Sequence, residues 1–288
     1  MRLKQYIKEN RSQPIKLEEA MNTMERHCMK ALKSNWSIYR GNDQLYDAFY
    51  FISPGKSMPR ESPYATNNIY NELLSNLHSW KKYPQRNKSL ICSTSFQTGN
   101  RYGGDYPYLV LPFDRSKVGV CPKSDIWYSF KDFPMLGRPA GLNELNVQMS
   151  YLFKNIIGMT SYDTYDEIVK NCNKIDSIRD NWVDEDEDNE GHTYTFEEYV
   201  YDKVDSDCVD FFIKNVRYLY QKNVTLLGVL EKALDPEYNG FSIKKVGEGM
   251  VHNDLEVWTD GDCLMIKMDR EVIEHLGDFQ KYINMENV

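Results

Sequence analysis

The chain has 288 residues, a formal net charge of −8 and a high count of 21 tyrosines. Its length suffices for one large domain or two smaller ones with a sizeable core. The negative charge argues against a broad, non-specific nucleic-acid footprint. No apolar run reaches the roughly 18 residues of a membrane-spanning helix, and the first residues lack a signal-peptide core. We therefore expect a cytoplasmic protein that binds neither nucleic acid nor a membrane.

Common cofactor and metal motifs do not occur in the sequence. The six cysteines show neither CxxC nor CxxH spacing, so we interpret them as reduced, buried side chains. The acidic run at 184–191 lacks the spacing of an EF-hand, so no metal is expected there. No G-x-G-x-x-G follows a strand and opens a helix, and no P-loop or HExxH is present, which argues against a Rossmann enzyme.

Residues 1–35 are predicted to be helical, with acids early and lysines late, as the helix dipole prefers. The apolar side chains that recur there at helical spacing are Leu17, Met21, Met24, Cys28 and Leu32. Two β-prone runs follow at 36–41 and 47–53. Apolar residues on one face then predict a helix at about 66–80.

After Pro84 the sequence predicts strands separated by turns. Leu90-Ile91-Cys92 form the core of a buried strand that ends in three hydroxyl side chains. A turn or short helix leads to Gly103-Gly104, and a strong strand is expected at 106–114. Residues 132–238 have mostly helical periodicity instead, so we expect a helical insertion between two β-rich parts.

The stretch 253–266 is predicted to form a β-hairpin. It turns at Asp260-Gly261, and Asp-Gly is a strong hairpin signal. Residues two apart in a strand share a face, so Asp254 and Glu256 are expected to point the same way. Carboxylates on a buried hairpin need partners because their desolvation is costly. The plainer interpretation is a solvated edge strand.

Three separated motifs occur in a specific order along the chain: Tyr39-Arg40-Gly41, Ser93-Thr94-Ser95 and Asp254-Leu255-Glu256. This order resembles the arginine, STS and Gln/Glu-x-Glu motifs of the R-S-E class of mono-ADP-ribosyltransferases, which includes exoenzyme toxins and phage proteins. Tyr102 falls where such proteins have an aromatic residue in a loop over the nicotinamide. The chain departs from the family pattern at Asp254, which is one carbon shorter than glutamate.

The resemblance covers roughly residues 36–130 and 241–268. It implies an α+β fold, namely an ADP-ribosyltransferase-like split β-sandwich in which two small sheets pack around an NAD cleft. The expected organisation is an N-terminal helical segment at 1–35, an ADP-ribosyltransferase-like domain at 36–131 and 239–288, and a helical insertion at 132–238.

The resemblance also implies the catalytic residues. Breaking the bond between nicotinamide and ribose in NAD develops positive charge on the ribose, and a nearby carboxylate stabilises this oxocarbenium-like transition state. That role falls to Glu256, with Ser93 orienting it. Asp254 is expected to contact the protein acceptor, and an acid there suggests arginine as the modified residue.

The same resemblance implies a set of residues that bind NAD. Arg40 offers a planar fork of donors suited to the pyrophosphate. Ser93 and Ser95 are expected to orient the ribose, and Tyr102 to stack on the nicotinamide. Thr94 belongs to this set although strand alternation turns it to the other face.

Each motif also has a structural interpretation. Arg40 is then a surface ion-pair partner, the STS run a strand end whose hydroxyls bond locally, and Tyr102 a core side chain. Three functions therefore stay open. The first is an NAD-dependent mono-ADP-ribosyltransferase acting on a protein, the second a non-catalytic binding or structural protein on the same scaffold, and the third an NAD glycohydrolase with water as the acceptor.

Overall fold

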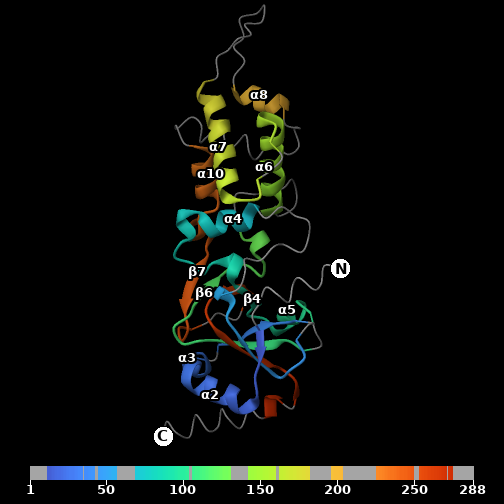
Figure 1. Cartoon of the computed structure of the whole chain (residues 1–288). Coiled ribbons are helices and arrows are strands. Elements are labelled where there is room, and N and C mark those ends of the chain that lie inside the picture. Colours follow the sequence, from blue (N-terminus) through green and yellow to red (C-terminus); the bar gives the residue numbers. More distant parts are fainter. Residues whose placement is uncertain are drawn as a thin grey trace, which may run out of the picture. The chain divides into compact units, whose positions relative to one another are not determined.

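The computed structural model describes residues 12–34, 36–42, 45–56, 69–103, 106–130, 142–159, 162–181, 196–203, 225–249, 253–270 and 272–274. The chain divides into two compact units, and Figure 1 labels several of their elements. Unit 1 comprises Met1–Arg60, Lys82–Asp125 and Phe241–Val288, and unit 2 comprises Glu61–Lys81 and Ile126–Gly240. Residues 61–81 thus belong with the helical insertion, although the sequence assigned them to the β-rich domain.

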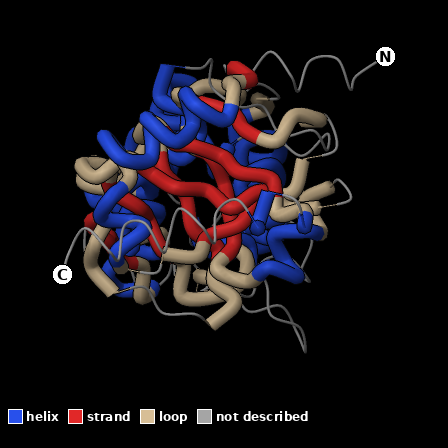
Figure 2. The backbone as a smooth tube through the Cα atoms, turned by 90° about the horizontal axis from the view of Figure 1, so that it is seen from below, coloured by secondary structure: helices blue, strands red, loops and turns tan. Residues whose placement is uncertain are grey.

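Unit 1 is built on one antiparallel sheet of nine described strands, drawn in red in Figure 2. Their order is β1-β3-β9-β5-β2-β4-β8-β6-β7. The strands are β1 (Ser12–Pro14), β2 (Ile38–Arg40), β3 (Phe49–Ile52), β4 (Leu90–Ser93), β5 (Tyr108–Pro112), β6 (Lys117–Val120), β7 (Ser242–Lys245), β8 (Glu256–Thr259) and β9 (Cys263–Lys267). Helices with an antiparallel sheet agree with the expected α+β class. The strands form one hydrogen-bonded sheet, however, where the sequence led us to expect two.

Pairing in this sheet is weakest between β2 and β4. These two described strands share a single register pair, Tyr39 with Ser93. Their outer neighbours pair much further: β4 aligns with β8 from Leu90 to Ser93, and β5 with β9 along its whole length. The sheet is therefore split into the halves β1-β3-β9-β5-β2 and β4-β8-β6-β7.

The prediction of a β-hairpin at 253–266 is wrong. Strands β8 and β9 do flank the Asp260-Gly261 turn, but β8 pairs with β4 and β6, and β9 pairs with β3 and β5. The chain thus crosses from one half of the sheet to the other. An Asp-Gly pair marks a turn, but it does not determine the partners of strands that have neighbours on both sides. Glu256 consequently lies in a central strand, which excludes the solvated edge strand.

Helices α2 (Leu17–His27) and α3 (Met29–Lys33) confirm the helical prediction for this part of unit 1, although a short strand precedes them. The predicted buried face is partly wrong, because Leu17 is 41% exposed. The side chains that join the core of the sheet are Ala20, Met24, Cys28 and Ala31. Alanines let a helix approach the sheet closely, whereas hydrophobic periodicity gave the larger side chains more weight. The short helix expected after the STS run is α5 (Phe96–Asn100).

Trp258 on β8, in the half β4-β8-β6-β7 of the sheet, is fully buried. It pairs in register with Gly119 on β6, and a Cβ at Gly119 would collide with the indole ring. We expect Gly119→Ala to lower the free energy of unfolding by about 1–3 kcal/mol through overpacking, measured by urea denaturation. Gly249→Ala is the matched control, because a Cβ there meets nothing within 4 Å. A similar loss in both variants would contradict this account of Trp258.

The regular elements of unit 2 in the described residues are helices and 3-10 turns. They are α4 (Ile69–Asn76), the 3-10 turns His78–Trp80 and Ile126–Tyr128, α6 (Leu142–Ile157), α7 (Tyr165–Asp180), α8 (Phe196–Lys203), α10 (Leu226–Ala233) and α11 (Pro236–Asn239). Helices α6 and α7 lie side by side (Figure 1). The helix expected at 66–80 is shorter than predicted, since α4 gives way to a 3-10 turn. The acidic run at 184–191 lies outside the described residues.

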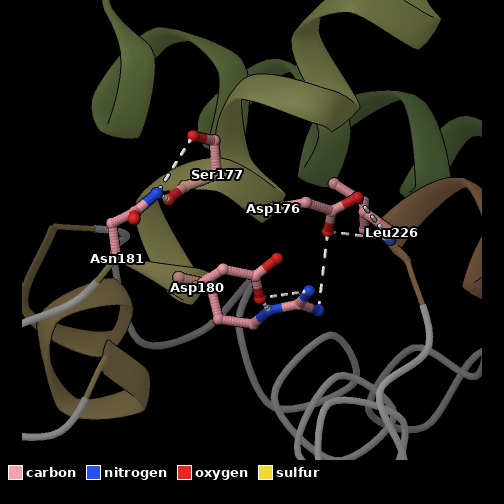
Figure 3. Close-up of polar contacts among 6 residues, drawn as sticks. Asp176, Ser177, Asp180, Asn181 and Leu226 are labelled. Atoms are coloured by element: carbon pink, nitrogen blue, oxygen red, sulfur yellow. Dashed lines mark hydrogen bonds and ion pairs between the residues drawn. The ribbon is translucent and has the colours of Figure 1, made fainter.

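A buried carboxylate joins two helices of unit 2. Asp176 on α7 accepts hydrogen bonds from the backbone N–H of Leu226 at 3.0 and 3.2 Å, and Arg179 lies 3.6 Å from one of its oxygens (Figure 3). Burial raises the pKa of the Asp176 carboxyl, and these two partners oppose the rise. Asp176 therefore satisfies the first N–H of α10, which is a structural role.

Within the parts of the chain that the structure describes, no helix has both the length and the apolar character needed to cross a membrane.

Candidate functional site

The three motifs singled out in the sequence meet on adjacent strands of unit 1. Ser93 on β4 pairs in register with Tyr39 on one side and with Glu256 on the other. Arg40 follows Tyr39 at the end of β2. The structure thus brings Arg40, Ser93 and Glu256 together at the split in the sheet, as the resemblance implies. The roles assigned to them stay predictions.

Arg40 is buried, with 7% of its surface exposed, so its interpretation as a surface ion-pair partner is wrong. Its Nη1 donates a hydrogen bond of 2.7 Å to the carbonyl of Ile91 on β4. If the β2–β4 ladder continued beyond Tyr39–Ser93, Gly41 would lie opposite Ile91. The guanidinium therefore replaces a backbone hydrogen bond at the place where the sheet splits, and buried carbonyls need such partners.

We expect Arg40→Met to lower the free energy of unfolding by about 1–3 kcal/mol, because the Ile91 carbonyl loses its donor inside the protein. Urea denaturation measures this loss. The control is Arg115→Met, at an exposed arginine of the same unit, where we expect a change within about 0.5 kcal/mol. If the two variants lose equal stability, the Ile91 bond is not what makes Arg40 structurally important.

The three hydroxyls of the STS run have three different positions. Ser93 is fully buried; its Oγ accepts from the Ser95 N–H at 3.0 Å and donates to Oδ1 of Asp254 at 3.3 Å. Thr94 lies beyond the end of β4, and its Oγ1 accepts from the Leu255 N–H at 2.8 Å. Ser95 caps the first turn of α5. These bonds tie the end of β4 to the segment that leads into β8.

Asp254 does not share a strand face with Glu256, contrary to the sequence-based expectation. Strand β8 begins at Glu256, and Asp254 has a φ of 49°, in the left-handed region that aspartate tolerates better than most residues. The turn and the bond from Ser93 place its carboxylate at the site instead. Its side chain is exposed, so Asp254 forms the solvent-accessible rim of the cluster.

Glu256 forms a buried ion pair that the sequence did not predict. It is 4% exposed, and its Oε1 lies 2.6 Å from Nη1 of Arg86, in the 3-10 turn Arg86–Lys88 that precedes β4. Oε1 also accepts a longer hydrogen bond of 3.8 Å from the Cys121 thiol. A single arginine before a strand carries no recognisable signal. The contact arises because the turn before β4 is anchored to Trp258, from where the Arg86 side chain reaches Glu256.

Trp258 holds Arg86 in place. It lies two residues after Glu256 in β8, so the two side chains share a face of the strand. The Arg86 guanidinium carbon lies 5.8 Å from the centroid of the indole ring. The indole Nε1 donates a 2.9 Å hydrogen bond to the carbonyl of Pro84, two residues before Arg86. The turn that carries Arg86 is thereby anchored to β8.

Tyr102 packs against the charged groups of the cluster. Its ring centroid lies 5.0 Å from the guanidinium carbon of Arg40, a cation–π contact. Burial raises the pKa of the Tyr102 phenol, and the negative charge of Glu256 raises it further, while Arg40 and Arg86 act in the opposite direction. Tyr102 therefore lies close to all three charges and stays a neutral phenol at ordinary pH.

The cluster thus combines two buried guanidiniums, one buried carboxylate and a set of hydroxyls. Guanidiniums bind phosphate groups well, and a carboxylate stabilises a positive charge that develops beside it. His252 lies outside the described residues. Among the residues that are described, no group of three or more His, Cys, Asp or Glu side chains could hold a metal ion. Two open hollows lie elsewhere, each lined by the side of one helix, α7 or α2.

No protein-family model, curated protein or solved structure matches this chain.

Proposed function

We propose that the protein is an NAD-dependent mono-ADP-ribosyltransferase that modifies a protein acceptor. The observation that supports this proposal best is the register of Ser93, which pairs with both Tyr39 and Glu256 and so gathers the three motifs on adjacent strands. The single pair that joins β2 to β4 is compatible with a split β-sandwich, in which a cleft separates two halves.

The chemical types of the side chains at the site suit the parts of NAD. Arg40 would bind the pyrophosphate, Ser93 and Ser95 would contact the ribose, and Tyr102 would stack on the nicotinamide. In the described arrangement Arg40 is buried and the Tyr102 ring lies against its guanidinium. Binding therefore requires Tyr102 to move away from Arg40, after which its ring is available to the nicotinamide.

When bound, NAD supplies an electrophilic ribose carbon whose bond to nicotinamide breaks. Glu256 provides a fixed negative charge next to the positive charge that develops there, in surroundings that exclude water and so strengthen the attraction. Ser93 is held by Ser95 and Asp254, so its hydroxyl is preorganised. Asp254 is exposed and would meet the acceptor, and a carboxylate there favours the guanidinium of an arginine.

The test is incubation of the protein with NAD labelled on the ADP-ribose and a lysate that supplies acceptors. We expect labelled protein with the wild type and none with Glu256→Ala. Free ADP-ribose without labelled protein would indicate an NAD glycohydrolase instead. If NAD is not consumed and does not raise the melting temperature, as a ligand of the folded state must, the proposal is wrong.

A second candidate is a non-catalytic binding or structural protein on the same scaffold. The observation that favours it is that both key side chains already have partners inside the protein: Arg40 bonds to Ile91, and Glu256 pairs with Arg86. On this reading the two residues hold the split sheet together. Substitutions at Arg40 and Glu256 would then lower the free energy of unfolding, and the wild type would neither bind nor consume NAD.

A further inference from the structure

We infer that Arg86 positions the Glu256 carboxylate for ribosyl transfer, an inference that rests on the function proposed above. Arg86 is a positioning residue because it acts through Glu256. The two side chains are 10% and 6% exposed, and their closest atoms, Nη1 and Oε1, lie 2.6 Å apart. A buried, charge-assisted contact of this length fixes both the direction and the charge of the carboxylate.

The orientation of Arg86 is itself determined by its surroundings. Its guanidinium lies over the Trp258 ring and reaches Glu256, and these two partners are on the same face of β8. The indole cannot shift toward β6 without consequence, because it already fills the space opposite Gly119. The Trp258–Pro84 hydrogen bond fixes the start of the turn that carries Arg86. The planar guanidinium therefore presents its donors to Glu256 in one direction, which a lysine ammonium could not reproduce.

The titratable and charged groups around Glu256 come from several elements. Arg86 from the 3-10 turn and Cys121 after β6 contact its carboxylate. Tyr102 after α5 interacts with the charges of Glu256 and of Arg40 from β2, and Asp254 before β8 bonds to Ser93, the register partner of Glu256. Arg40 donates a hydrogen bond to the Ile91 carbonyl and, on the proposed function, binds phosphate. Arg86 is in direct contact with the Glu256 carboxylate. Without it, a buried carboxylate favours its protonated form, which stabilises a positive charge poorly.

The experiment compares wild type, Arg86→Gln and Arg86→Lys in the rate of nicotinamide release from NAD across the pH range, each well below its own melting temperature. Arg86→Gln should lower kcat by about 10²-fold, the loss typical of a misplaced reacting group. KM should change little, because Arg86 acts through Glu256 on this inference and not by binding NAD. The acid limb of the pH profile should move to higher pH by about 1–3 units, since the uncompensated carboxylate protonates more easily. Arg86→Lys keeps the charge, so it should restore the acid limb but only part of kcat.

Arg115→Gln is the matched control, because it removes the same charge from an exposed position of unit 1. It should leave kcat and the pH profile unchanged. A fall in kcat for Arg86→Gln with an unmoved acid limb would overturn the inference, since a purely structural role predicts that result. A rise in KM at constant kcat would also overturn it and would make Arg86 a binding residue.

A second readout separates this inference from the proposed function. The pH titration of tryptophan fluorescence reports the charge of Glu256 through Trp258, which lies on the same face of β8, without any turnover. Each titration is taken as the difference from the same protein carrying Glu256→Gln. The midpoint should rise in Arg86→Gln. If wild type consumes no NAD but the midpoint rises, the proposed function fails while the control of Glu256 by Arg86 stands. If the midpoint does not move, the inference fails whatever the protein does with NAD.

Discussion

Glu256→Gln is expected to lower the turnover of NAD by about 10²–10³-fold, the loss seen when one preorganised electrostatic group is removed from an active site. Glutamine has nearly the same shape as glutamate and can still accept a hydrogen bond from Arg86. What it lacks is the negative charge that stabilises positive charge on the ribose. The loss should therefore appear in kcat, with little change in KM. Initial rates of nicotinamide release measure both.

The control for this prediction is Glu25→Gln, on the exposed side of α2, which changes the net charge by the same amount. It should have wild-type turnover. Circular dichroism and melting temperature must show that Glu256→Gln is folded, because the variant removes the negative charge that pairs with Arg86. Wild-type turnover in a folded Glu256→Gln variant would remove Glu256 from the catalytic role.

Much of unit 1 could be predicted from local sequence signals. The strands around Tyr39 and Ile91 and the helix after Ser95 follow from short-range periodicity and turn residues, and the structure has them near the expected positions. The resemblance carried by the three motifs also led us to expect Arg40, Ser93 and Glu256 close together, and the register of β2, β4 and β8 brings their positions to adjacent strands. The strands and the helix could be predicted because each depends on residues only a few positions apart. The expected meeting of the three motifs depends instead on the resemblance to a known family.

The errors lie where the outcome depends on distant parts of the chain. Asp260-Gly261 does make a turn, yet the pairing of β8 and β9 is decided by the strands beside them. Arg86 was missed for the same reason, since its contact with Glu256 depends on how the turn before β4 packs against Trp258 on β8. Asp254 leaves the strand because its backbone is in the left-handed region, which the alternation argument does not consider.

The ion pair between Arg86 and Glu256 gives the second large expected effect. Arg86→Met alone should lower the free energy of unfolding by about 3–5 kcal/mol, because it leaves a buried carboxylate without its counter-charge. Adding Glu256→Leu should restore much of this loss, since an apolar pair needs no compensation. Urea denaturation of wild type, both single variants and the double variant gives the coupling energy, expected at about 2–3 kcal/mol or more because the double variant recovers most of the single-variant loss.

The exposed pair Arg270–Glu274 is the matched control. Its closest atoms lie 3.3 Å apart, but the side chains are 94% and 70% exposed, so the same cycle should give a coupling of about 0.5 kcal/mol or less. A coupling at Arg86–Glu256 no larger than this would show that water screens the pair, and that Glu256 is not held as the structure indicates. A large coupling together with a double variant as stable as wild type has a further consequence. The charges are then dispensable for folding, so their presence in the core calls for a function such as the one proposed.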